Sequence, residues 1–266
     1  MPIFQLILIA LIQGITEFLP VSSSAHLILL PKLTGLQDQG LAIDVAVHIG
    51  TLIAVLFYLR TDISVLLQGL TQALGFKRKT AAFSLLAYLI IATIPVVLFG
   101  FLIKLVSLDE SLRSVEIIAW AMLIFGLVLY YTDQKSIDTK DTNSWSHRSA
   151  LIMGLWQALA LIPGASRSGT VISGARLLGF SRQASAKLAM LMAIPTIIAS
   201  GALLSVDVIK SGNLSLVKDF VLAATLSFFA ALLSIRFMMY FLTKYSFTPY
   251  VVYRVLLSLI LLALIY

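Results

Sequence analysis

The sequence predicts an all-α integral membrane protein, with six transmembrane helices and two re-entrant helical hairpins in two inverted-topology repeats. Of its 266 residues, 60% are hydrophobic and only 12% are charged, whereas soluble domains have roughly 45–50% apolar and about 25% charged residues. Residues 81–103 carry no charged side chain at all. At about 1.5 Å of helix rise per residue, such a run crosses a hydrocarbon core of roughly 30 Å.

Six apolar segments have the length and composition of membrane-spanning helices. They are residues 41–59, 81–103, 115–131, 188–206, 220–242 and 248–266. Because these segments recur along the whole chain, we expect a single membrane domain over residues 1–266.

Two further apolar segments, residues 3–30 and 149–175, are interrupted at their middle. The first contains QGITEFLPVSSS at residues 13–24, and the second contains QALALIPGASRS at residues 157–168. Each has a glutamine, an apolar run, a proline and then serines. Broken backbone at membrane depth is tolerated only where it lines a cavity inside the protein. Both segments are therefore predicted to be re-entrant hairpins beside a polar cavity.

Each interrupted segment is followed by three predicted crossings. A unit with an odd number of crossings must repeat with opposite orientation, and paired broken helices indicate a binding site near the membrane midplane. The sequence thus predicts a first repeat over residues 1–132 and an inverted second repeat over residues 149–266.

The basic residues indicate orientation and do not indicate nucleic-acid binding. The net charge is +7, but the cations lie between apolar segments, where they act as topology signals and lipid-headgroup contacts. The predicted cytoplasmic set is Arg60, Lys77, Arg78, Lys79, Lys135, Lys140, Arg148, Arg182 and Lys244. Both termini are then expected to face outward. Since the chain has no cysteine, disulfides and thiolate metal sites are excluded.

The first hairpin carries an acid in an apolar setting. Glu17 follows Gln13 by one helical turn, so both side chains are predicted to face the same side, toward the break at Pro20. An ionisable residue at this depth is costly and is a functional candidate by default. A protonated Glu17 hydrogen-bonded to a neighbouring helix is the structural alternative.

Serines follow this break where a second helix should begin. Ser22, Ser23 and Ser24 are suited to cap that helix, and its free N–H groups can bind a phosphate. His26 lies one turn after Ser23, where a general base or a nucleophile could act. Alternatively, the serines permit close helix packing and His26 is a hydrogen-bonded core residue.

The second hairpin offers a cation at its own break. Arg167 lies between Ser166 and Ser168, after Pro163 and Gly164. A guanidinium can hold a phosphate through two parallel hydrogen bonds, and glycine would let a ligand approach the backbone. Arg167 could instead form a structural pair with Glu17, and such a pair is compatible with function if substrate displaces it.

Three other polar residues lie within predicted spans. Asp44 and His48 are one helical turn apart. They could bind a metal or act as an acid–base pair, or they could form a buried pair that supports the hairpin. Arg254 lies near the start of the last span, and it is expected to snorkel outward or to pair with a helix end.

At these residues the sequence resembles the undecaprenyl-diphosphatase family of bacterial membrane phosphatases, the bacitracin-resistance type. Gln13 and Glu17 match a motif of glutamate or glutamine, three residues, then glutamate. The match continues through residues 18–26 with FLPVSSSAH, a proline-glycine-x-serine-arginine-serine motif matches residues 163–168, and residues 43–51 also have the family pattern. The resemblance covers nearly the whole chain.

The resemblance implies a function, a location and a set of roles. It implies hydrolysis of undecaprenyl diphosphate at a bacterial cytoplasmic membrane, which recycles the lipid carrier for cell-wall synthesis and confers bacitracin resistance. Glu17 and Gln13 would bind a divalent cation, Mg²⁺ or Ca²⁺, or position water. Ser23 or His26 would attack phosphorus, and Arg167 would hold the diphosphate. The cavity would open to the outer face, with the prenyl tail lying among the helices.

Two positions depart from the family pattern. The family has a threonine three residues after the second serine, but Val171 stands there and Thr170 precedes it. We therefore keep Thr170 as a candidate substrate contact. Residues 187–190, KLAM, replace the usual phenylalanine-serine-phenylalanine, which raises the question of altered tail packing.

Two functions from different classes follow from these features. The first is the phosphatase, with Glu17, Ser23 and His26 as catalytic candidates. Its substrate would be bound by Arg167 together with Ser22, Ser24, Gly164, Ser166, Ser168 and Thr170. The second is a transporter or flippase for an anionic phospho-prenyl lipid, because inverted repeats with broken helices are common in transporters. The sequence leaves oligomeric state open, a homodimer included.

Overall fold

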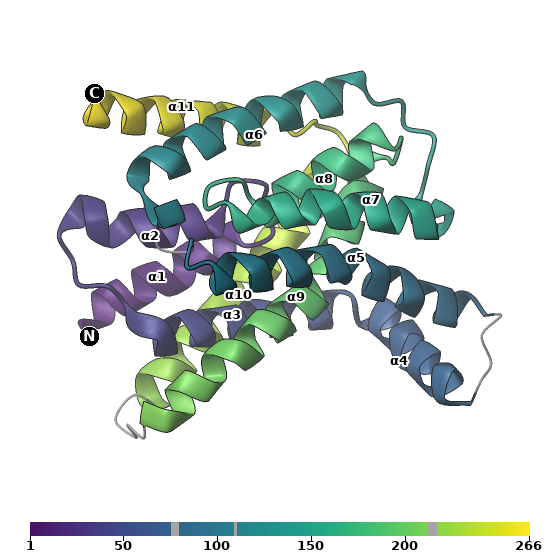
Figure 1. The fold of residues 1–266 in the computed structure, drawn as a ribbon, viewed down its shortest axis with the longest axis horizontal. Helices are drawn as coiled ribbons and strands as arrows, with labels where there is room; N and C mark the ends of the chain where they lie inside the picture. Colours follow the sequence, from purple (N-terminus) through teal and green to yellow (C-terminus); the bar gives the residue numbers. More distant parts are fainter. Residues whose placement is uncertain (76–79, 109–110, 212–216) are drawn as a thin grey trace.

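The computed structural model describes residues 1–75, 80–108, 111–211 and 217–266, with the backbone alone described for residues 202–211. Lys77, Arg78 and Lys79, which contribute to the predicted orientation, lie outside the described residues. Within the described ranges the chain forms eleven α-helices (Figure 1). They are α1 (Ile3–Thr16), α2 (Ser23–Thr34), α3 (Gly40–Tyr58), α4 (Arg60–Leu74), α5 (Ala81–Leu105), α6 (Val115–Lys135), α7 (His147–Ala158), α8 (Arg167–Leu177), α9 (Arg182–Ser211), α10 (Val217–Phe241) and α11 (Thr248–Ile265).

Six helices are long and apolar enough to cross a membrane. They are α3, α5, α6, α9, α10 and α11, and they fall on the six predicted spans. The prediction of a multi-pass, all-α membrane protein is therefore confirmed. The largest boundary difference is at α9, which begins at Arg182. The two charges in this first part of the helix are paired, Arg182 with Asp133 and Lys187 with Asp62.

The two interrupted segments are helix-break-helix units, as expected. In the first, α1 and α2 are separated by residues 17–22. In the second, α7 runs into a short 3-10 turn at Leu159–Leu161 and is separated from α8 by residues 162–166. In both, the residue before the new helix is a serine with positive φ, 74° at Ser22 and 72° at Ser166. The two breaks therefore share one local backbone design.

Helix α4 was not expected from the sequence. It contains Arg60 and Asp62 among its first residues, so it is too polar to read as a span. The ribbon shows α4 diverging from the other helices next to α5 (Figure 1). Gly69 permits close packing there, since a Cβ at this position would lie 2.4 Å from the Ala82 carbonyl oxygen. Asp62 also pairs with Lys187 of α9 at 2.8 Å.

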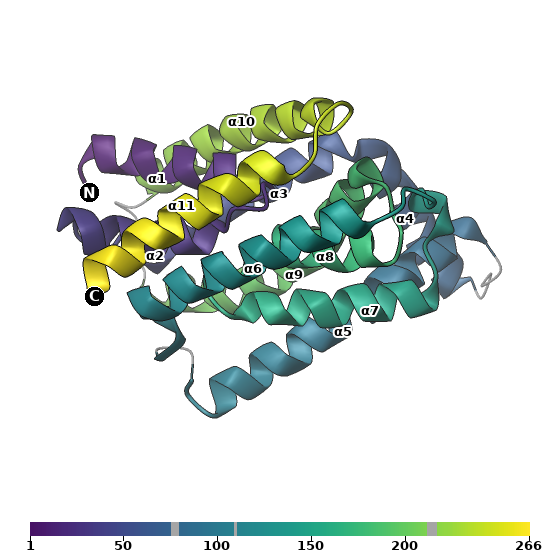
Figure 2. The same ribbon diagram turned by 90° about the horizontal axis from the view of Figure 1, so that it is seen from above.

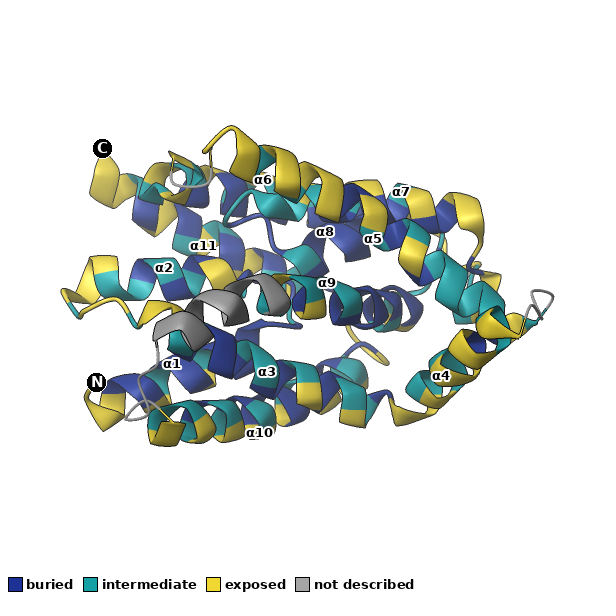
Figure 3. Cartoon of the chain, turned by 60° about the horizontal axis from the view of Figure 1, so that its bottom comes forward, coloured by how far each residue is buried: buried dark blue, intermediate teal, exposed yellow. Residues whose placement is uncertain are grey.

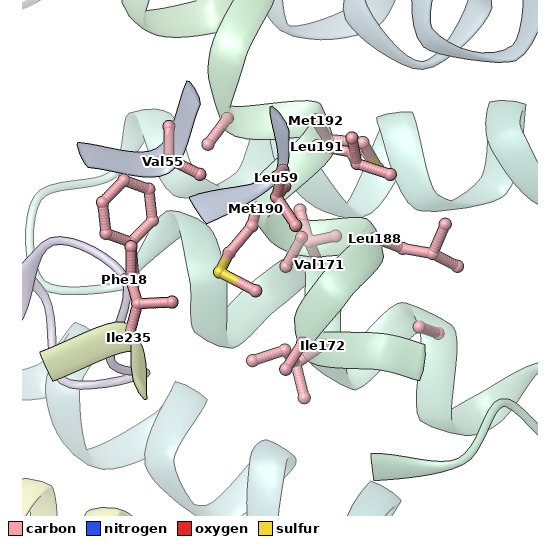
Figure 4. Close-up of a cluster of buried hydrophobic side chains, with 14 of the residues drawn as sticks. Phe18, Val55, Leu59, Val171, Ile172, Leu188, Met190, Leu191, Met192 and Ile235 are labelled. Carbon is pink, nitrogen blue, oxygen red and sulfur yellow. The ribbon is translucent and has the colours of Figure 1, made fainter. Parts of the chain in front are cut away.

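The main apolar core surrounds α8 and α9 (Figures 3 and 4). Val171 is fully buried there, and Leu188, Ala189 and Met190 are at most 4% exposed. Figure 4 shows Val171, Leu188 and Met190 among the side chains of this core. The two departures from the family pattern thus fall in the protein interior, apart from Lys187, which pairs with α4.

An ion network ties four helices together at one end of the bundle. Asp133 at the end of α6 accepts hydrogen bonds from Arg176 of α8 at 3.0 Å and Arg182 of α9 at 2.8 Å. It also accepts one from the backbone N–H of Phe247, just before α11, at 3.2 Å. Arg176 is only 1% exposed and pairs with Asp138 as well. Because these charges are paired, the network can lie in the interior.

Candidate active site

The structure brings the two helix breaks into direct contact. Arg167 Nη2 lies 2.5 Å from Glu17 Oε1, although 150 residues separate them. Ser168 Oγ of the second break also donates to the Leu19 carbonyl of the first, at 2.7 Å. The two interrupted segments, which the sequence analysis placed beside one polar cavity, therefore meet in the structure.

Glu17 is the centre of this cluster. It is 7% exposed, and its second carboxylate oxygen accepts hydrogen bonds from Gln13 Nε2 at 2.8 Å and from Ser23 Oγ at 2.6 Å. With Arg167 on the first oxygen, three donors satisfy one buried carboxylate. Such charge-assisted bonds offset the cost of removing the carboxylate from water.

The serines next to the breaks cap the helices that follow. Ser22 Oγ accepts from the backbone N–H of Ala25 at 3.4 Å, and Ser166 Oγ accepts from that of Gly169 at 3.2 Å. Ser22 lies 3.3 Å from Ser24 and Ser166 lies 3.2 Å from Ser168, oxygen to oxygen. The N-terminal ends of α2 and α8 carry partial positive charge, so this arrangement favours an anion.

A cavity of about 150 Å³ lies at this junction. Its lining residues come from both breaks and from neighbouring helices, and they are Glu17, Ser22, Ser23, Ser24, His48, Ala160, Ser166, Arg167, Ile197 and Ser200. A larger cavity of about 460 Å³ shares Ser24, His48 and Ser200 with it. The small polar cavity therefore continues into a wider and more apolar one.

Ser23 and His26 occupy different environments. Ser23 lines the cavity and donates to Glu17, which is the arrangement of a nucleophile beside a base. His26 Nδ1 lies 2.7 Å from the Ser22 carbonyl oxygen, and Nε2 lies 2.5 Å from the Tyr253 hydroxyl. Those partners assign the proton to Nδ1 and make Nε2 an acceptor. Both nitrogens of His26 are thus engaged away from the cavity lining.

The remaining candidates of the second hairpin bond mainly to the protein. Thr170 Oγ1 donates to the Arg167 carbonyl oxygen at 3.0 Å. Gly164 has a φ of 93°, and a Cβ there would lie 2.5 Å from the Ile118 carbonyl oxygen. The close approach at Gly164 is therefore made by α6, where the sequence analysis expected a ligand.

The donor set for a cation is small. Glu17 supplies a carboxylate, and Gln13 Oε1 is buried with no hydrogen-bond partner in the described part of the chain. No group of three or more His, Asp or Glu side chains suited to a metal occurs among the described residues. A hard cation here would take these two oxygens and would need others from substrate and water, as Mg²⁺ commonly does with phosphates.

Asp44, His48 and Arg254, the other polar candidates, make contacts that the sequence did not predict. His48 Nδ1 lies 2.7 Å from the Asp44 carbonyl oxygen, while the Asp44 carboxylate accepts from Gln39 at 2.9 Å. Asp44 and His48 are therefore not a carboxylate–imidazole pair, although His48 lines the cavity. Arg254 does not snorkel outward, since it is fully buried. Its acceptors are backbone carbonyls on other segments, which sequence spacing cannot reveal.

These features define the class of protein. The chain is a multi-pass helical membrane protein with a buried acid–serine–arginine site, suited to an anion, where two broken helices meet. It matches the family model of the bacitracin resistance protein BacA over residues 6–260, and it belongs to that family.

Curated relatives match over the full chain. It is 54% identical over 266 residues, the whole of both chains, to an undecaprenyl-diphosphatase of Dinoroseobacter shibae. It is 55% identical over the same length to an undecaprenyl-diphosphatase of Roseobacter denitrificans. One from Campylobacter curvus is 45% identical over 262 residues, 98% of each chain.

Proposed function

We propose that this protein is a membrane phosphatase that hydrolyses undecaprenyl diphosphate to undecaprenyl phosphate and inorganic phosphate. The relatives that bear this name match the chain from end to end. One structural observation carries the proposal. A serine hydroxyl, a carboxylate and a guanidinium converge in a cavity formed at two helix N-termini. These groups can supply the nucleophile, the base and the charge stabilisation that phosphoryl transfer requires.

Binding begins with the terminal phosphate at the junction of the breaks. Its oxygens would accept hydrogen bonds from the first-turn N–H groups of α2 and α8 and from Arg167. The guanidinium must then share or release Glu17, which it contacts in the free site. The wider cavity beside Ser24 and His48 would take the start of the prenyl chain.

The chemistry follows from the contact between Ser23 and Glu17. As Ser23 Oγ forms a bond to the terminal phosphorus, Glu17 accepts the hydroxyl proton and the bridging oxygen leaves with undecaprenyl phosphate. Water then attacks the phosphoserine and the bond between phosphorus and Ser23 Oγ breaks. Glu17 returns its proton to Oγ, and the proton lost by the water leaves with inorganic phosphate. Arg167 and the helix N-termini stabilise charge on the phosphoryl oxygens in both steps.

A divalent cation fits this site in part. Glu17 and Gln13 would hold Mg²⁺ or Ca²⁺, which when bound would neutralise part of the diphosphate charge. The unpartnered Gln13 Oε1 supports this assignment. Both proposed roles of Glu17, as cation ligand and as base, depend on its carboxylate.

The location proposed for the protein is the bacterial cytoplasmic membrane, with the two hairpins re-entrant and the cavity open to the outer face. The N- and C-termini lie at the same end of the molecule in two perpendicular views (Figures 1 and 2), which supports a common side for both. Single cysteines at Ser111 and Lys135 would flank α6. Impermeant thiol reagents should label the first and spare the second in intact cells, and the reverse pattern would invert the orientation.

Phosphate release from purified protein tests the function. In detergent there are no compartments, so a transporter or flippase releases no phosphate from prenyl diphosphates whereas the proposed phosphatase does. C55 and shorter prenyl diphosphates should be compared, with Ser23→Ala as the inactive variant. Ser84→Ala, on α5 and outside the site, is the matched control. Equal phosphate release by the Ser23→Ala and Ser84→Ala variants would remove Ser23 from the mechanism.

A further inference from the structure

Arg254 of α11 is a buried cation without an acidic partner. It is fully buried, and no ion pair in the described part of the chain includes it. An arginine side chain keeps its charge in a protein and has five N–H donors. In an interior position, those donors must therefore be satisfied by neutral acceptors.

Those acceptors are backbone carbonyls of both helix breaks. Arg254 Nη1 donates to Pro20 in the first break at 3.2 Å, across 234 positions of sequence. Nη2 donates to Gly164 at 2.9 Å and to Ala165 at 3.0 Å in the second break. Nε donates to Met122 of α6 at 3.2 Å. One side chain thus joins the two breaks and attaches both to α6.

The contacted carbonyls lie next to the functional side chains. Pro20 comes two residues before the left-handed Ser22 that caps α2, and Ala165 comes directly before the left-handed Ser166 that caps α8. Those caps fix the first turns that carry Ser23 and Arg167. The position of the guanidinium therefore determines how the nucleophile and the phosphate-binding cation are separated.

The surroundings leave room for an arginine. A Cβ on Gly169 would lie 2.9 Å from Arg254 Nη1, and one on Gly126 would lie 3.3 Å from the Arg254 Cβ. Lysine could not reproduce the contacts, because its single ammonium cannot reach both breaks in the way a planar fork does. Arg254 is also absent from the lining of the cavity that holds Glu17 and Arg167.

We infer that Arg254 is a positioning residue, which acts through the two backbone breaks to hold Ser23 and Arg167 at the separation that phosphoryl transfer needs. The inference rests on the proposed phosphatase function. Tyr253, the neighbour of Arg254, also helps to position the first break. Its hydroxyl bonds one nitrogen of His26, and the other nitrogen of His26 bonds the Ser22 carbonyl.

The test is Arg254→Lys in the purified full-length protein, with the folded fraction measured by gel filtration and thermal unfolding. Loss of the charge-assisted bonds to one break should lower kcat at least about tenfold, with KM within about threefold. In the double variant with Arg167→Lys, the loss should be smaller than the product of the single losses, because both act on one geometry. Fully multiplicative losses, or a kcat within about twofold of wild type, would overturn the inference.

Arg176→Lys is the matched control. Arg176 is also buried, but its partners are Asp133 and Asp138 at the far end of α8. This variant should unfold at lower temperature while its folded fraction keeps wild-type kcat. If Arg254→Lys does not fold, Gly126→Ala replaces it, because the three atoms nearest an added Cβ all belong to Arg254. Its kcat should fall by about twofold to tenfold, and an unchanged kcat would contradict the inference.

A measurement without turnover separates this inference from the proposed function. The chain has no cysteine, so Ser23→Cys has a single thiol, whose alkylation by iodoacetate reports its surroundings. Adding Arg254→Lys should change the alkylation rate at least about fivefold, whereas adding Arg176→Lys should not. Equal rates would reject positioning by Arg254. Absence of phosphate release by the wild type would reject the phosphatase and leave the alkylation result unaffected.

Discussion

The two helix breaks share a serine cap with positive φ, but the side chains around that cap carry opposite charges. Each presents a left-handed serine that caps the following helix. Around the first, the functional groups are the Glu17 carboxylate and the Ser23 hydroxyl, and around the second they are Arg167 and its flanking serines. The same cap is thus used twice, and under the proposed mechanism the side chains next to it divide the roles of base, nucleophile and anion binding.

The breaks also differ in how firmly they are packed. Every residue of α8 from Ser168 through Arg176 is buried, whereas only Ala25, Leu27 and Leu29 are buried in α2. Figure 3 shows the same contrast between the largely dark α8 and the mixed colours of α2. Arg167 therefore lies on the better-packed side of the site, and Ser23 on the side with fewer interior contacts. Adjustment to substrate is expected first in α2.

The largest effect is expected where the first break supplies the nucleophile. Ser23→Ala should lower kcat by more than about 10⁴-fold, because removing a nucleophile removes the covalent route entirely. Quenching of wild-type turnover with denaturant at neutral to alkaline pH, where a phosphohistidine also survives, followed by peptide mass spectrometry, should find phosphate on Ser23. A phosphate on His26 instead would move the nucleophile one turn along α2.

A smaller loss is expected for the charge of Glu17. Glu17→Gln keeps the shape of the side chain but removes the base, so kcat should fall by about 10²- to 10⁴-fold. Glu17→Asp retains a carboxylate on a shorter side chain, so it distinguishes loss of the charge from loss of the side-chain length. If a cation is bound, chelator should inhibit the wild type, and magnesium should not restore the Gln variant. Full activity of Glu17→Gln with unchanged magnesium dependence would exclude both roles.

A substitution at the second break separates the geometry of the cation from its charge. Arg167→Lys replaces a two-pronged contact by one, and the missing charge-assisted bond is worth about 1.5–3 kcal/mol, or more than about tenfold in kcat. KM should change little if the fork tightens in the transition state. A raised KM with preserved kcat would make Arg167 an anchor of bound substrate alone.

The smallest effect is expected at Tyr253, whose hydroxyl bonds His26 Nε2 at 2.5 Å and is linked through that ring to the first break. Tyr253→Phe keeps the stacked ring but removes the hydroxyl, so kcat should fall by about twofold to tenfold, as for one neutral hydrogen bond. His26→Ala, which also frees the Ser22 carbonyl, should cost more. Equal losses for both variants would show that His26 has no function beyond its bond to Tyr253.

The sequence predicted the parts of this structure that depend on local composition. The six spans followed from long apolar runs with few charges, since a charge within the hydrocarbon core is costly. Both breaks were visible as proline and serine clusters, and Glu17 and Arg167 were visible as charges inside apolar segments. The contact between them was one of the alternatives that the pattern allowed.

What the sequence could not predict depends on contacts between distant segments. Arg254 bonds to main-chain carbonyls, which every residue possesses, so no partner could be recognised from residue type. The imidazole of His26 turns toward Tyr253 on α11, although helical spacing from Ser23 suggested a common face. Helix α4 was missed because it is too polar to span a membrane, although its apolar residues recur on one face at helical spacing, a signal that could have identified it.

The ion pair between Arg167 and Glu17 gives the free site an internal competitor. A ligand that binds the Arg167 guanidinium must displace the Glu17 carboxylate from it. The apparent affinity of that ligand is therefore the intrinsic affinity multiplied by the fraction of molecules in which the pair is open. A diphosphate, with more negative charge, meets this demand better than a monophosphate does. Once Glu17 has returned its proton, the re-formed pair with Arg167 would favour release of inorganic phosphate and would limit rebinding of undecaprenyl phosphate.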